Sequence, residues 1–162
     1  MNLRQKKHRR VQSGQAHSVE FGLALGIIFV LIFFPFIDFL FYSFAYGAGY
    51  FLNFTQLRQA ALTKNTDVKA EMDQITKDWS DTGMGQFVSK GQEPPKTEVT
   101  YKATGVGTDY EVTVTTTVNA NTLIKIPFLS SIPGFGAPVQ FTYSGQRLLE
   151  NSSDYTAPAP TK

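Results

Sequence analysis

The sequence predicts an α+β fold: a long N-terminal transmembrane helix, kinked near Pro35, and a second, amphipathic helix packed on a small antiparallel three-stranded β-sheet. Three observations predict it. Residues 21–37 contain no charged side chain, residues 66–82 carry apolar side chains at helical spacing, and the apolar period changes to two within residues 97–150. Of the 162 residues, about 100 lie beyond the apolar tract, enough for one small domain.

Residues 1–14 form a basic leader. No acidic residue precedes Glu20, whereas the basic residues before it are Arg4, Lys6, Lys7, Arg9 and Arg10. Because cytoplasmic flanks of membrane helices are rich in lysine and arginine, we expect the leader to be cytoplasmic and the rest exported. A net charge of +2 indicates no nucleic-acid partner. The absence of cysteine excludes disulfides, thiolate metal sites and a cysteine nucleophile.

Residues 15–62 are predicted to form the hydrophobic helix, with its transmembrane span at about 21–42. At about 1.5 Å of rise per residue, residues 21–41 cover the roughly 30 Å hydrocarbon thickness of a bilayer. Three interpretations stay open. The segment is a removed signal peptide, although its apolar tract exceeds the usual length of roughly 7–15 residues; it is a plain anchor; or it is an anchor whose leader is cut between Gly14 and Gln15.

Glu20 lies at the mouth of the apolar tract. A carboxylate at the edge of the hydrocarbon is costly unless it is paired or hydrated, and such residues are functional by default. In an assembling bundle of helices, its partner would be the ammonium group of a new N-terminus, its own or a neighbour's. Glu20 would then set the axial register between subunits. The alternative is a carboxylate wetted at headgroup level, without a role.

Four further residues of the helix are candidates for helix packing. Pro35 lacks an amide donor and is expected to kink the helix near Ile32 or Phe33. Asp38 is either a polar contact at the midplane or a marker of the outer interface, and the length of the charge-free run favours the interface. Gly47 and Gly49 permit close approach of another helix, or loosen the helix as it leaves the lipid.

Beyond the membrane, residues 66–82 are predicted to form the amphipathic helix, ended by Gly83 and Gly85. Residues 89–96 are a linker whose paired prolines forbid helix. Residues 97–150 form the exported antiparallel β domain, with a hairpin over 97–118 and a third strand over 139–150. Residues 151–162 are polar and proline-rich, and a disordered tail is expected there.

The segment between the second and third strands, residues 122–138, is too apolar for an ordinary solvated loop. It either packs as core, which we favour, or forms a contact surface for a partner. Its candidate contact residues are Leu123, Ile126, Phe128, Ile132 and Phe135.

The sequence indicates no enzyme, no cofactor and no metal site. Both histidines, His8 and His17, precede the apolar tract. The exported part lacks a nucleophile–histidine–acid order, a phosphate-binding glycine motif and metal-ligand spacing.

Taken together, the chain resembles the TadE-like minor pilins and pseudopilins of the tight-adherence (type IVc) pilus system. The motifs that carry the resemblance are the basic leader with GQAHSVEFGLAL, the single hydrophobic helix, LRQAA at 57–61, a Thr/Val-rich strand followed by a Pro-rich apolar loop, and QRLLE at 146–150. The resemblance covers most of residues 9–151. It implies a single-pass protein of the bacterial inner membrane that helps to assemble a pilus for surface attachment. It also implies other pilin subunits, a prepilin peptidase, and the assembly platform with its ATPase as partners, besides the lipid bilayer.

One departure from that family pattern concerns the leader. The family's glutamate is normally the fifth residue after the cleavage glycine, and Glu20 is the sixth after Gly14. Either the peptidase tolerates the extra residue, or the cut falls elsewhere, or the chain is not processed. The alternative function is accordingly an unprocessed, membrane-anchored β domain that serves as a binding or scaffold module in the cell envelope.

Overall fold

The computed structural model describes residues 19–104, 109–125, 129–150 and 155. Its elements follow in the order η1 (Phe29–Phe33), α2 (Phe34–Leu62), α3 (Val68–Asp81), α4 (Gly83–Ser89), β1 (Lys96–Ala103), β2 (Tyr110–Ala120) and β3 (Val139–Leu148). This is an α+β fold with one long apolar N-terminal helix and a three-stranded antiparallel sheet, as the sequence predicts.

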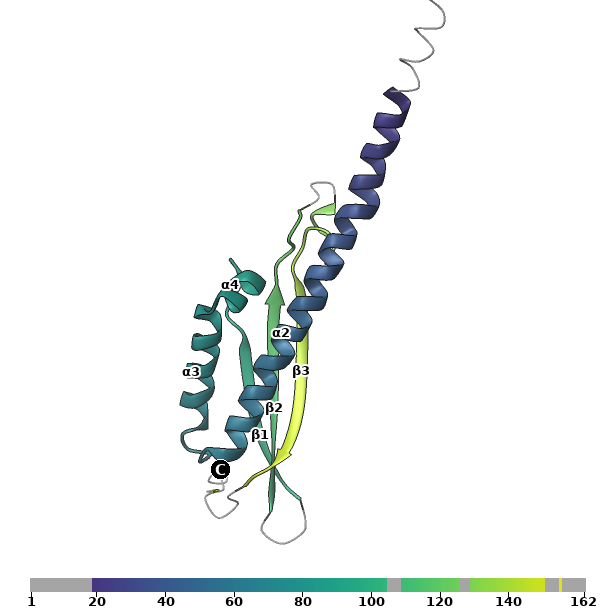
Figure 1. Ribbon diagram of the computed structural model, residues 1–162. Helices are drawn as coiled ribbons and strands as arrows, with labels where there is room; N and C mark the ends of the chain where they lie inside the picture. Colours follow the sequence, from purple (N-terminus) through teal and green to yellow (C-terminus); the bar gives the residue numbers. More distant parts are fainter. Residues whose placement is uncertain (1–18, 105–108, 126–128, 151–154, 156–162) are drawn as a thin grey trace, which may run out of the picture.

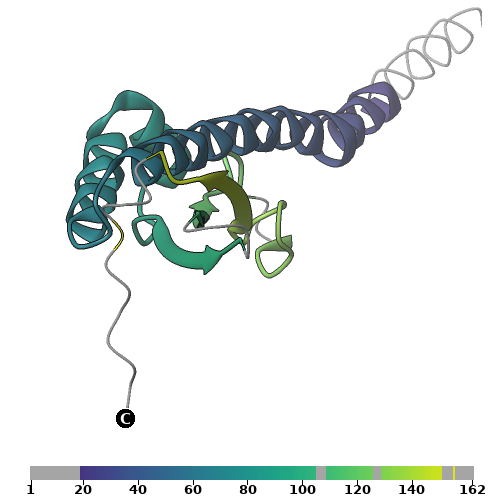
Figure 2. The same cartoon turned by 90° about the horizontal axis from the view of Figure 1, so that it is seen from below.

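The long helix is continuous over Val19–Leu62, 44 residues in all. Its N-terminal half projects away from the rest of the molecule, whereas its C-terminal half lies along the sheet (Figure 1). The view turned by 90° shows the same projection (Figure 2). By length and composition this helix can cross a membrane, and only 6% of its most apolar 18-residue window is buried. The projecting half is therefore an apolar rod without cover from the described part of its own chain.

The proline within the rod follows a π-helical turn. In η1 the amide of Phe34 donates to the carbonyl of Phe29, five residues back. Pro35 follows at the start of α2. A proline ring clashes with the carbonyl four residues before it, and the wider π turn accommodates that ring. The kink expected at Ile32 or Phe33 stays a prediction.

The sheet has the order β1-β2-β3, with both pairs antiparallel. The central strand β2 alternates between fully buried and half-buried residues along its length. Its buried side chains are Val112, Val114, Thr116, Val118 and Ala120. The opposite face is polar, and hydroxyls pair across the strands there, as in Thr115 with Ser144. One face of the sheet is therefore packed and the other faces solvent.

The long helix, more than the amphipathic one, covers the packed face of the sheet. Phe41, Ala45 and Leu52 of α2 join Val118 and Tyr143 in one core cluster. In the second cluster, Ala60 and Ala61 of α2 meet Val112 and Val114. The amphipathic helix α3 lies beside α2 and β1 (Figure 1) and adds Met72 and Trp79 to these two clusters. Both residues belong to the core, in agreement with their spacing in the sequence.

A short helix that the sequence analysis does not anticipate follows α3. The chain leaves α3 at Asp81, and Thr82 caps α4 by accepting a hydrogen bond from the amide of Gly85 at 3.2 Å. A Cβ atom at Gly85 would lie 2.1 Å from the carbonyl oxygen of Trp79, so only glycine fits this reversal. Gly83 and Gly85, which were expected to end the amphipathic helix, instead lie within α4, because α3 ends at Asp81 and the chain reverses at the extended residue Thr82.

Two buried amides tie the long helix to the other elements. Gln56 is completely buried; its Nε2 donates to Thr76 of α3 and Thr97 of β1, both at 2.9 Å, and its Oε1 accepts from Thr116 of β2 at 2.6 Å. Asn53 lies one turn earlier and donates to the Val114 carbonyl and the Thr116 hydroxyl, both at 3.0 Å. Because buried amides cost several kcal/mol unless they are satisfied, these bonds fix which turn of α2 meets which strand.

We predict that Gln56→Leu lowers the free energy of unfolding by about 2 kcal/mol, because it removes the three hydrogen bonds of the Gln56 amide to hydroxyls of α3, β1 and β2. The matched control is Gln74→Leu, since Gln74 is exposed on α3 and bonds only Asp78; a change of less than about 0.5 kcal/mol is expected there. Urea denaturation of the full chain in detergent micelles, followed by the fluorescence of the single tryptophan, measures both. Equal effects of the two substitutions would contradict the role given to Gln56.

Candidate functional site

The outward face of the long helix is the candidate site. On this face large apolar residues recur at helical spacing and remain exposed past the predicted span. We call them the outward stripe; they are Phe36, Leu40, Tyr50, Phe51 and Phe54. The exposed fractions of the last three are 57%, 61% and 51%. Apolar residues so exposed over several turns mark an interaction surface.

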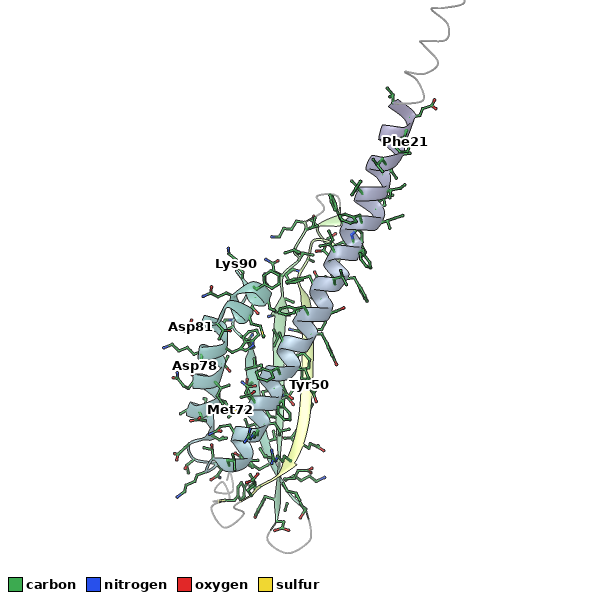
Figure 3. The ribbon with its side chains drawn as sticks, in the orientation of Figure 1. Phe21, Tyr50, Met72, Asp78, Asp81 and Lys90 are labelled. Atoms are coloured by element: carbon green, nitrogen blue, oxygen red, sulfur yellow. The ribbon has the colours of Figure 1, made fainter. Side chains whose placement is uncertain are left out.

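The stripe exists because α2 has two apolar faces. Its inner face carries the small and aliphatic residues of the core, Ala45, Ala48 and Leu52 among them. Aromatic residues occupy the opposite side, where the described chain supplies no cover; Tyr50, labelled on α2 in Figure 3, is one of these exposed residues. A helix apolar all round is expected in lipid or inside a larger assembly.

The two candidate packing glycines have different surroundings. A Cβ atom at Gly49 would lie 2.6 Å from both Cε2 and the hydroxyl oxygen of Tyr143, whereas one at Gly47 would meet nothing within 4 Å. Gly49 therefore serves the contact between α2 and β3 within this chain. Gly47 lies on the exposed side, on the same face as the outward stripe, and its role in helix packing stays a prediction.

Tyr143 secures this close contact between helix and sheet. Its hydroxyl donates to the Tyr46 carbonyl at 3.0 Å, and its ring lies 5.3 Å from the Tyr46 ring. Burial raises the pKa of the Tyr143 hydroxyl above its ordinary value, and the neighbouring Tyr46 adds to the effect. Two strand residues later, Gly145 permits an equally close approach, since a Cβ atom there would lie 2.7 Å from Leu57. These contacts of Tyr143 and Gly145 with α2 were not predicted from the sequence, although a glycine inside an alternating strand is a signal of close approach.

Asp38 is buried under the segment that follows β2. Its side chain is 1% exposed, and its Oδ1 accepts a hydrogen bond from the amide of Ile124 at 3.0 Å. Tyr42 and Thr122 lie beside it, and Gly134 of the same segment approaches the Tyr42 ring. Asp38 thus holds a loop of its own chain against α2.

The apolar segment 122–138 lies only partly as expected. Leu123 and Ile132 are exposed, and Phe135 is half-buried. The described residues of this segment thus pack against α2 near Asp38 but do not bury their largest apolar side chains. Ile126 and Phe128 lie outside the described residues.

The residues predicted for leader processing and axial register lie at or beyond the N-terminal limit of the described chain. Gly14 and Gln15 lie outside the described residues. Glu20 lies in the first described turn of the helix and is exposed. Its predicted role in axial register stays a prediction.

The described residues offer little for catalysis. A hollow of about 620 Å³ lies beside α4, and Lys90 is the single ionisable side chain among the residues that line it. Within the described ranges, no group of three histidine, cysteine, aspartate or glutamate residues could hold a metal ion. The features that stand out are surfaces for binding.

Comparison with protein-family models, with curated proteins and with solved structures finds no match to this chain.

We predict opposite effects for the same substitution at the two glycines. Gly49→Ala should lower the free energy of unfolding by about 1–3 kcal/mol, because its methyl group overlaps Tyr143. Gly47→Ala should raise it by up to about 1 kcal/mol, because alanine favours the helix and the site is open. Thermal denaturation of the two variants in the same detergent tests this, and a stability loss at Gly47 equal to that at Gly49 would contradict it.

Proposed function

We propose that this protein is a minor pilin or pseudopilin that contributes to the assembly of a tight-adherence type pilus used in surface attachment. Its long helix anchors it in the bacterial inner membrane with the N-terminus cytoplasmic. The same helix packs against the helices of other subunits, and the β domain lies outward on the exported side. Its further partners are the prepilin peptidase and the assembly platform with its ATPase.

The observation that carries the proposal is that one apolar helix continues from the proposed membrane span into the part that covers the sheet. A plain anchor needs about 20 apolar residues. Here the helix continues to Leu62, and its outward stripe remains apolar as far as Phe54. Residues of the stripe beyond the bilayer have no lipid to cover them. A bundle of like helices would cover both halves of the rod at once.

Two features at the N-terminus support the same function. The basic leader ends in Gly14, the proposed cleavage position, and Glu20 would then lie near the new N-terminus. A carboxylate there would pair with an ammonium group of a neighbouring subunit and set the step between subunits. A kink at Pro35 would change how the long helices of neighbouring subunits pack against one another.

The alternative, an unprocessed anchor that displays a binding domain, differs in its leader. On export and processing, the mature protein should lack its first 14 residues, as the intact mass of membrane-extracted protein from its own host would show. Retention of the full leader would exclude peptidase processing and favour the alternative.

A substitution at Glu20 tests assembly directly. Because the chain has no cysteine, Phe51→Cys places one thiol on the outward stripe, and a short bis-maleimide should link neighbouring subunits in the membrane. Adding Glu20→Ala should reduce this cross-linking several-fold without changing the amount of membrane-inserted protein. The matched control, Gln74→Cys on α3, should cross-link weakly with or without Glu20. Cross-linking through Phe51→Cys that is unaffected by Glu20→Ala would contradict the register role.

A further inference from the structure

The membrane-proximal end of the exported domain is defined by the helix itself. If Glu20 lies at one boundary of the hydrocarbon, a rise of about 1.5 Å per residue over about 30 Å places the other boundary near Leu40. Two parts of the domain reach α2 at this level. The segment after β2 is bonded to Asp38 through Ile124, and the α4 residue Phe87 contacts Phe41 and Phe44 with ring centroids 5.2 and 5.8 Å away.

Exposed apolar side chains gather at this end. Outside the long helix, the exposed large apolar residues of the described chain are Met84, Phe87, Leu123, Ile132 and Leu148. Leu148 ends β3, at the far end of the domain from the projecting helix (Figure 1). The other four belong to α4 and to the segment after β2, which lie toward the projecting half of α2 (Figure 1). The distribution is therefore biased toward the side where the bilayer would be.

These residues are held by the fold. Phe87 packs edge-on against two rings of α2, and its neighbour Val88 is completely buried. Leu123 lies between Thr122, which is buried, and Ile124, whose amide is bonded to Asp38. Phe87 and Leu123 are therefore exposed beside residues that are packed or hydrogen-bonded to α2. They belong to two separate parts of the chain, α4 and the segment after β2.

The charges at this end suit a phospholipid surface. Lys90 follows α4 and Lys125 follows Ile124, and both are exposed. Of the acidic groups near this end, Asp38 is buried and accepts the Ile124 amide, and Glu93 is paired with Lys96. Asp81 and Asp78 lie on α3, farther from the projecting helix than Lys90 (Figure 3). Apolar side chains flanked by lysine are the composition by which interfacial segments bind headgroups and the acyl boundary.

We propose that Met84, Phe87, Leu123 and Ile132 insert into the exported-side surface of the bilayer, with Lys90 and Lys125 at its anionic phosphates. This inference rests on the single-pass anchoring in the proposed function. With contacts on two elements beside the helix, the bilayer would fix the tilt of the rod and the orientation of the β domain before assembly. Extraction of a subunit from the membrane would require release of these contacts.

The test is the depth of nitroxide labels on single cysteines, in full-length protein reconstituted in liposomes with about one third anionic phospholipid. Labels at Phe87→Cys and Leu123→Cys should show headgroup-level depth, with oxygen accessibility raised and nickel-chelate accessibility lowered at least two-fold relative to Leu148→Cys. Leu25→Cys, within the span, reports insertion. Labels at 87 and 123 as accessible to the nickel chelate as the label at 148 would overturn the proposal, while a buried label at 25 would leave the anchoring intact. A water-accessible label at 25 would overturn both.

A charge reversal tests the lysines. Lys90→Glu with Lys125→Glu should shift the label at 123 toward water in anionic liposomes, whereas Lys69→Glu on the exposed start of α3 should not. If neither variant changes the depth, the part of the proposal that assigns phosphates to Lys90 and Lys125 is wrong. Because no other subunit is present, these results do not depend on pilus assembly.

Discussion

The structure depends on a polar constraint inside an apolar helix. Leucine or phenylalanine at every inner position of α2 would let the helix slide or rotate on the sheet at little cost, since apolar contacts are non-directional. Gln56 and Asn53 remove that freedom, because their amides are satisfied only when one turn of the helix meets Thr76, Thr97 and Thr116 together. Gly49 and Gly145 then permit α2 and β3 to approach closely on either side of that turn. The register of the helix on the sheet is set by these hydrogen bonds and by the close approach that the two glycines permit.

That register joins the apolar rod to the β domain. One continuous helix supplies the apolar rod and also the largest share of the cover over the sheet. Any rotation or tilt of the rod in the bilayer is therefore passed directly to the β domain. The register also determines which face of α2 stays uncovered. Because the inner face packs against Val118 and Tyr143, the outward stripe is left exposed. The proposed assembly role and the proposed bilayer contact both follow from this geometry.

Much of the fold could be predicted from the sequence, because local patterns determine it. The charge-free run, the apolar spacing at Val68, Met72 and Trp79, and the alternation in β2 each identify one element. The pairing of elements could not be predicted in this way. The burial of Asp38 depends on a loop amide 86 positions away, and Gln56 is an ordinary helix residue until three threonines of other elements surround it. The short helix α4 was not predicted because Gly83 and Gly85 favour the end of a helix, whereas here Thr82 ends α3 and caps a new helix that contains both glycines.

We expect the β domain to fold as one unit with the C-terminal half of the long helix, because the two share both core clusters. Hydrogen exchange of the full chain in lipid nanodiscs, measured over a series of urea concentrations, tests this dependence. The amides of residues 52–61 in α2 and 112–118 in β2 should lose protection together, at the same urea concentration and with the same dependence on it. Protection of β2 that persists after residues 52–61 have opened would show a sheet that folds without the helix, and would contradict this dependence.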